Sequence, residues 1–203
     1  MLDPYVRAVP RAPHPLSEPM STTVTTKLAP LLSYLDTLSD QRADVQRLAT
    51  CLEQLGDLTL DDLSDHAIFD EHEYRRNLIC EGPMYEVLAL CWLSGQRSPI
   101  HDHANSVCGV KVIAGNATEV RYGSTPCGQV APKDARELSE GGVCASADSD
   151  IHELSNLEAA GCDLVTLHIY SPPLREMGMY DPGKPGKALY RPVNFEFHSG
   201  SGI

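Results

Sequence analysis

The chain has 203 residues, of which 42% are hydrophobic and 22% charged, as is ordinary for a folded globular protein. Its formal net charge of -12 excludes a nucleic-acid surface, which needs a basic face. No apolar run approaches the length that crosses a bilayer, and the first 24 residues lack the basic-then-apolar order of a secretory signal, so we expect no membrane partner.

The beginning of the chain is rich in proline, with five prolines in the first 24 residues, and we predict a disordered Pro-rich tail over 1–24. The remainder, 25–203, is predicted to form one domain, with helices over about 25–65 and a barrel over about 70–200. A one-sided row of leucines beyond Thr26, with Pro30 near its start, predicts the first helix. Asp40 is the predicted N-cap of a second helix that stops at Gly56.

Short strands are predicted after about residue 70, over 84–93, 107–114, 117–122 and 164–170. Gly115-Asn116 is predicted to be the turn of a hairpin. Such strands, broken by Gly and Pro, indicate a mainly β protein built as an antiparallel barrel or sandwich. The acidic residues between 134 and 163 are assigned to loops, and His66 to the surface.

The seven cysteines are odd in number and lie mostly inside apolar runs such as 88–92. This distribution indicates buried thiols in a reducing compartment rather than a disulfide framework. We therefore expect a cytoplasmic protein.

A pair of histidines provides the strongest chemical signal, because His101 and His103, two apart on a strand, would project to the same side. The spacing from Gly95 through this pair and Cys108 to Gly115 reproduces the first cupin motif. Cupins usually place a glutamate ligand where this chain has Cys108. Downstream, His152-x-x-x-Asn156 resembles the end of the second cupin motif, so His152 is predicted to join the pair as a third ligand.

A site of three histidines suits Zn, Cu, Fe and Ni about equally well, so spacing alone does not name the metal. Without a protein carboxylate, the site would keep the full charge of a divalent ion. That charge favours an anionic chelating substrate, and a thiolate meets this requirement because metal binding lowers the pKa of a thiol.

Three segments of the chain resemble the cysteine dioxygenase family: 98–115, 167–173 and Tyr74-x-Arg76-Asn77-Leu78. The likeness runs from Tyr74 to about Tyr180. It implies a cupin (jelly-roll) barrel preceded by α-helices, and Fe(II) held by the three histidines. It also implies that L-cysteine binds the iron through its thiolate and amine, and that both atoms of O2 are added to its sulfur. The product, cysteine sulfinic acid, would place the enzyme in cysteine catabolism.

The resemblance also implies roles for other side chains. Arg76 would bind the carboxylate of the substrate, with Tyr74 facing the same cavity. Thr166, His168 and Tyr170 alternate along one strand and would form a hydrogen-bonded relay that ends at the tyrosine hydroxyl.

Two further features follow from the family likeness. Cys108 and Tyr170 match the residues that form a thioether crosslink in cysteine dioxygenases of the eukaryotic type. The family also implies a cis peptide bond before Pro172.

Two other functions stay open at this stage. A sibling enzyme could oxidise 3-mercaptopropionate or another small thiol, although Arg76 favours cysteine because such relatives commonly lack this arginine. The chain could also be a non-catalytic metal-binding cupin, since one fold hosts many functions. We expect a monomer in either case.

Overall fold

The computed structural model describes residues 22–56, 58–147 and 150–196. Most of the predicted tail, residues 1–21, lies outside these ranges, and so does the end of the chain from residue 197. The first described element is a helix that begins at Thr22, a little before the predicted start of the helical region at residue 25. The disorder of the tail and the single domain over 25–203 stay predictions.

The N-terminal part is helical, with α1 (Thr22–Leu35), α2 (Val45–Glu53) and the short 3-10 helix η1 (Asp61–His66). The predicted N-cap of the second helix is wrong, because α2 begins five residues beyond Asp40. Asp44 caps it instead, and its carboxylate accepts a hydrogen bond of 2.8 Å from the backbone N–H of Arg47. Pro30 lies inside α1 rather than near its start.

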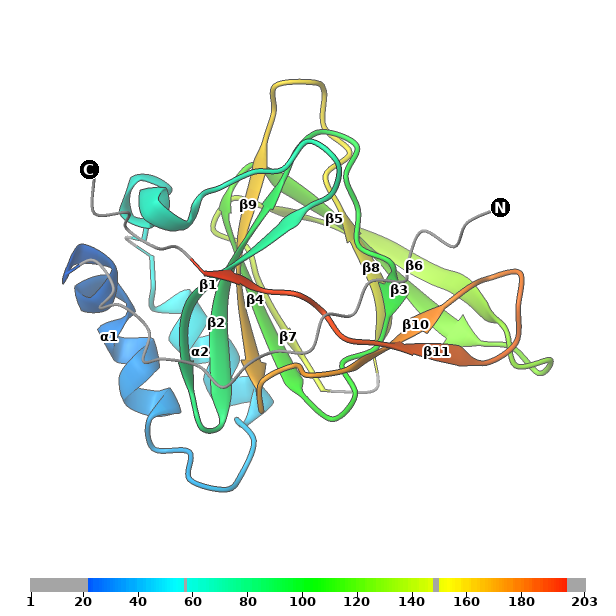
Figure 1. The fold of residues 1–203 in the computed structure, drawn as a ribbon, viewed down its shortest axis with the longest axis horizontal. Coiled ribbons are helices and arrows are strands. Elements are labelled where there is room, and N and C mark those ends of the chain that lie inside the picture. Colours follow the sequence, from blue (N-terminus) through cyan, green and yellow to red (C-terminus); the bar gives the residue numbers. More distant parts are fainter. Residues whose placement is uncertain (1–21, 57, 148–149, 197–203) are drawn as a thin grey trace.

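Two six-stranded sheets make up the rest of the molecule (Figure 1). The first sheet has the order β12 (Phe195–Glu196), β1 (Arg75–Gly82), β2 (Tyr85–Trp92), β9 (Leu164–Ser171), β4 (Val107–Ala114), β7 (Val143–Ser146). The second has the order β11 (Lys187–Tyr190), β10 (Met177–Tyr180), β3 (Ile100–His101), β8 (Ile151–Ser155), β5 (Asn116–Ser124), β6 (Val130–Ser139). The fold is therefore mainly β and of the cupin, jelly-roll kind, as predicted, although the sheets do not close into a continuous barrel.

Gly115 connects the two sheets and does not form the predicted hairpin. β4 pairs with β7 and β9, whereas β5 pairs with β6 and β8 in the other sheet. The turn needs glycine because φ is +81° and a Cβ atom would lie 2.5 Å from the carbonyl oxygen of Asp163. The position of the turn was predicted correctly, but the pairing of the strands that flank it was wrong.

The helices cover one face of the first sheet, and the other face looks toward the second sheet (Figure 1). α2 packs so closely on β4 that a Cβ atom at Gly109 would lie 2.8 Å from side-chain carbons of Leu48 and Leu52. In β9, Leu167 and Ile169 belong to the core beneath the helices, while Tyr170 belongs to the core between the sheets. The predicted alternation along this strand is confirmed, and the polar row that contains Tyr170 faces the space between the two sheets.

Two assignments to the surface or to loops are wrong. Asp134 lies in β6, an edge strand whose side chains are mostly exposed, and it forms an ion pair of 2.7 Å with Arg121. A strand exposed on both faces lacks the apolar alternation that identifies strands in a sequence. His66 ends η1 and is buried, with 6% of its surface exposed.

Within the described ranges, every helix falls short of the length or apolar character that a membrane crossing demands.

Candidate active site

Three histidines, two from the second sheet and one from the loop after β3, converge between the two sheets. His101 lies in β3 directly opposite His152 in β8, and His103 follows two residues after the end of β3. One ring nitrogen of each lies within 4.8 Å of the others, and all three side chains are buried. The structure thus brings the predicted trio together, although the strand that would align His101 with His103 ends at His101.

Asp102 anchors the loop that carries His103. Its carboxylate accepts hydrogen bonds from Gly178 N (3.0 Å), Tyr180 Oη (2.7 Å) and Lys187 Nζ (2.6 Å). Burial alone would raise the pKa of Asp102, but these hydrogen bonds outweigh it and the pKa is lowered. Asp102 is therefore committed to the β10–β11 hairpin and does not join the cluster.

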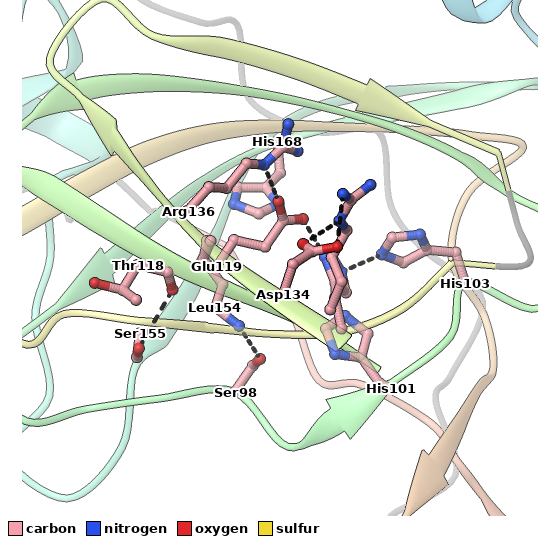
Figure 2. Close-up of polar contacts among 12 residues, drawn as sticks. Ser98, His101, His103, Thr118, Glu119, Asp134, Arg136, Leu154, Ser155 and His168 are labelled. Carbon is pink, nitrogen blue, oxygen red and sulfur yellow. Dashed lines mark hydrogen bonds and ion pairs between the residues drawn. The ribbon is translucent and has the colours of Figure 1, made fainter. Parts of the chain in front are cut away.

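Hydrogen bonds on the outer side of two histidine rings fix their tautomers. His101 Nδ1 lies 2.9 Å from the carbonyl oxygen of Pro99, which can only accept, so Nδ1 carries the proton and Nε2 offers a lone pair. His152 Nδ1 lies 2.7 Å from Oε1 of Glu119. Figure 2 shows Glu119 between Arg136 and the histidine cluster, with a contact to Arg136.

Glu119 stays ionised in this position. Burial alone would raise the pKa of Glu119, but hydrogen bonds from His152 and Arg136 outweigh it and lower the pKa to about 2. A carboxylate behind a metal-binding imidazole orients the ring and makes it a better ligand. Glu119 therefore supports His152 from outside the cluster, and among the described residues the group consists of the three imidazoles.

The donor set fits a divalent transition-metal ion. Nε2 of His152 and Nε2 of His103 are 3.1 Å apart. Imidazole nitrogens bind such ions at about 2 Å, so two of them at a right angle would be about 3 Å apart. Burial is the main cause that lowers the pKa of His101 to about 3, and the neighbouring His152 is the second cause. Burial also lowers the pKa of His103. Both rings are thus neutral at pH 7, which is the form that binds metal.

The polar row of β9 faces the histidines from the first sheet. His168 contacts Oγ1 of Thr166 through Nε2 (2.9 Å) and the hydroxyl of Tyr170 through Nδ1 (3.2 Å). The indole N–H of Trp92 donates to Oγ1 of Thr166 at 3.0 Å. The predicted row is therefore hydrogen-bonded from end to end, and it is extended by Trp92, which the prediction of the row did not include.

The ring of Tyr170 lies close to both Arg76 and the histidine cluster. The ring of Tyr170 has its centroid 5.5 Å from that of His103 and 5.3 Å from Cζ of Arg76. Arg76 is buried, and its Nη2 atom has no hydrogen-bond partner among the described residues. Tyr74, expected to face the cavity, stacks on Trp92 with ring centroids 4.2 Å apart.

Cys108 and Tyr170 are direct cross-strand partners in β4 and β9. Cross-strand partners on one face of a sheet have Cβ atoms about 5 Å apart, so the thiol and the phenol ring can reach one another. Burial raises the pKa of both side chains well above the ordinary values. The peptide bond between Ser171 and Pro172 is cis, which confirms the expectation for this position.

Sequence reasoning missed three residues beside the predicted site: Glu119, which contacts His152, and Glu86 and Asn194, which contact Arg76. Glu119 shares the inward face of β5 with buried Ala117. A charged residue on the inward face of a strand is the sequence signal that could have identified it. Glu86 is the one acidic residue in the apolar run 84–93, which was a similar signal. Nothing in the local sequence marks Asn194.

A cupin-type pair of sheets around a buried cluster of histidines defines a metal-binding cupin. The sequence model of the family described as cysteine dioxygenase type I matches residues 16–183. Human cysteine dioxygenase type 1 is 33% identical over 142 residues, covering 68% of this chain and 69% of its own. The rat protein of the same name is 32% identical over the same shares. The chain belongs to the cysteine dioxygenase type I family, and it is accordingly a dioxygenase.

Solved structures give weaker likenesses. A protein with a double-stranded β-helix domain from Klebsiella pneumoniae has a TM-score of 0.46 and 16% identity, covering 64% of this chain and 89% of its own. An RmlC-like cupin protein from Desulfovibrio desulfuricans has a TM-score of 0.40 and 22% identity, covering 52% of this chain and 89% of its own.

Replacing Glu119 with alanine should weaken metal binding about 10- to 100-fold, because His152 loses the carboxylate that orients it. Competition with a chelator of known affinity measures this constant. Asp134→Ala, which removes an exposed carboxylate from the neighbouring strand, is the matched control and should leave the affinity unchanged. Equal affinities for both variants would show that Glu119 has no part in the metal site.

Proposed function

We propose that the chain is a non-haem Fe(II) thiol dioxygenase that adds both atoms of O2 to L-cysteine and forms cysteine sulfinic acid. Sulfur supplies the electrons that O2 takes up, so the reaction needs no separate reductant. The observation that carries the proposal is that the ring of Tyr170 lies close both to a histidine cluster without a carboxylate and to a buried arginine. Membership of the cysteine dioxygenase family supports the same substrate.

His101, His103 and His152 would hold the iron as three neutral ligands. Bound ferrous iron would supply the positions at which a thiolate and O2 meet. Since the ligands are neutral, they leave the charge of the ion uncompensated, and an anionic thiolate restores the balance.

The residues of the first sheet would bind and orient the substrate. Arg76 would donate from Nη2 to the substrate carboxylate in a charge-assisted hydrogen bond. Tyr170 would keep its proton at the phenol oxygen, because burial raises its pKa, and His168 would fix the direction of that hydroxyl. Thr166 would hold His168 in turn, and Tyr74 would form part of the wall through Trp92.

We further propose a location in the reducing cytoplasm, supported by the presence of seven free cysteines, of which only Cys127 and Cys162 are exposed. The monomeric state stays a prediction.

The purified protein should contain iron and should convert L-cysteine to its sulfinate with one O2 consumed per product. Iron analysis, an oxygen electrode and mass spectrometry of the product measure the three quantities. A higher rate with 3-mercaptopropionate than with L-cysteine would assign the chain to the sibling enzymes. A protein without iron and without thiol-dependent O2 uptake would be a non-catalytic cupin.

Arg76→Gln should raise KM for L-cysteine about tenfold to a hundredfold, because a charge-assisted hydrogen bond contributes about 1.5–3 kcal/mol. Steady-state O2 uptake measures the change. Arg97→Gln is the matched control, since the exposed side chain of Arg97 pairs with Glu153, and this variant should keep the normal KM. An unchanged KM in Arg76→Gln would remove this residue from substrate binding.

Cys108 and Tyr170 should form a thioether bond during turnover, because they are buried cross-strand partners. The Cys108 sulfur would bond to a carbon of the Tyr170 ring, with loss of two hydrogens and O2 as the oxidant. Mass spectrometry of the intact protein after turnover should detect this loss, and Cys108→Ser should not show it. A fully turned-over protein that keeps both hydrogens would contradict the crosslink.

A further inference from the structure

A polar pair, one member fully buried and the other half-buried, lies behind Arg76 and has no part in the chemistry proposed so far. Glu86, in β2, is fully buried, and Asn194 comes from the segment between β11 and β12. Arg76 Nε donates to Oδ1 of Asn194 at 3.0 Å, and Asn194 Nδ2 donates to Oε2 of Glu86 at 2.9 Å. The second carboxylate oxygen of Glu86 accepts from the backbone N–H of Leu174 at 3.1 Å. Asn194 thus bridges the arginine and the glutamate.

This pair orients the guanidinium of Arg76 but leaves one of its nitrogen atoms without a hydrogen-bond acceptor among the described residues. Nη2 of Arg76 lies 3.7 Å from Oε1 of Glu86, which is close enough for an ion pair and too long for a hydrogen bond. The same Nη2 atom is buried and has no hydrogen-bond partner among the described residues. A buried donor without an acceptor is costly, so such an atom is suited to an acceptor that arrives with a ligand.

The register of the sheet explains why Asn194 reaches Arg76. β12 pairs in parallel with β1, with Phe195 opposite Asn77, and Asn194 immediately precedes this pair. The chain crosses from β11 in the second sheet to the β1 edge of the first just before this point (Figure 1). Arg75 lies over the ring of Phe195, 4.2 Å from its centroid, and helps to hold the crossing segment in place.

We propose that Glu86 and Asn194 are positioning residues that set the specificity of the enzyme for thiols that carry a carboxylate. Asn194 holds Nε of Arg76, which keeps Nη2 apart from Glu86 and available to the ligand. Glu86 fixes the amide of Asn194 and compensates part of the buried charge when no ligand is bound. This inference rests on the proposed function, since it takes Arg76 as the group that binds the substrate carboxylate.

Loss of the Asn194 amide should therefore have a selective effect. Without it, Nε loses its acceptor, and the guanidinium is free to turn toward Glu86 and close the 3.7 Å gap. A closed ion pair would compete with a ligand carboxylate for Nη2. Binding of a ligand that has the same thiol and amine but lacks the carboxylate should not change.

The experiment measures dissociation constants of the iron-loaded, O2-free enzyme for L-cysteine and for cysteamine by calorimetry. The wild-type enzyme should bind L-cysteine at least about tenfold more tightly than cysteamine. Asn194→Ala should lose about tenfold in affinity for L-cysteine and nothing for cysteamine. Asn194→Asp has nearly the same volume and should also lose selectivity, because its carboxylate occupies Arg76 and cannot donate to Glu86.

Val193→Ala is the matched control, because Val193 is the exposed neighbour of Asn194 and should keep the wild-type constants. Melting temperatures establish that each variant is folded. Asn194 variants that keep full selectivity, or that weaken both ligands equally, would overturn the positioning role while the proposed function stands. A wild-type enzyme that binds both ligands equally would overturn the carboxylate recognition in the proposed function, and the positioning role with it.

Discussion

The candidate site depends on three imidazoles that meet in a buried space, in a cluster that no carboxylate of the described residues joins. Two of the rings are fixed from behind, His101 by the carbonyl of Pro99 and His152 by Glu119. Glu119 thus orients one ligand of the cluster without being a ligand itself. Because burial keeps His101 and His103 uncharged, their nitrogens stay ready for a cation, and the charge of that cation stays available to an anionic ligand.

The two sheets contribute different kinds of residue to the site. The second sheet, through β3 and β8, carries the histidines that suit a metal. The first sheet carries Arg76 in β1, Cys108 in β4 and the polar row in β9, which ends at Tyr170. These polar groups lie on the face of the first sheet that looks toward the second sheet, opposite the face covered by the helices. The jelly roll therefore places metal ligands opposite the residues suited to a thiol substrate.

The parts of the fold that could be predicted are those with a local signal. Apolar runs identified β2, β4 and β9 because strands buried on both faces are apolar almost throughout. Strand pairing has no such signal, so the local sequence predicts a hairpin at Gly115, whereas this residue joins strands of opposite sheets. Most of the site could be predicted because motifs with fixed spacing carry it. The bridge from Glu86 to Asn194 spans 108 residues and follows only from the pairing of β12 with β1.

A crystal structure of the iron-loaded protein, with the metal located by its anomalous scattering, tests the central claim most directly. The account predicts one ion bound by a ring nitrogen from each of His101, His103 and His152, with Glu119 still hydrogen-bonded behind His152. An ion that takes a carboxylate oxygen as a protein ligand, or a His152 ring turned away from the other two, would contradict it.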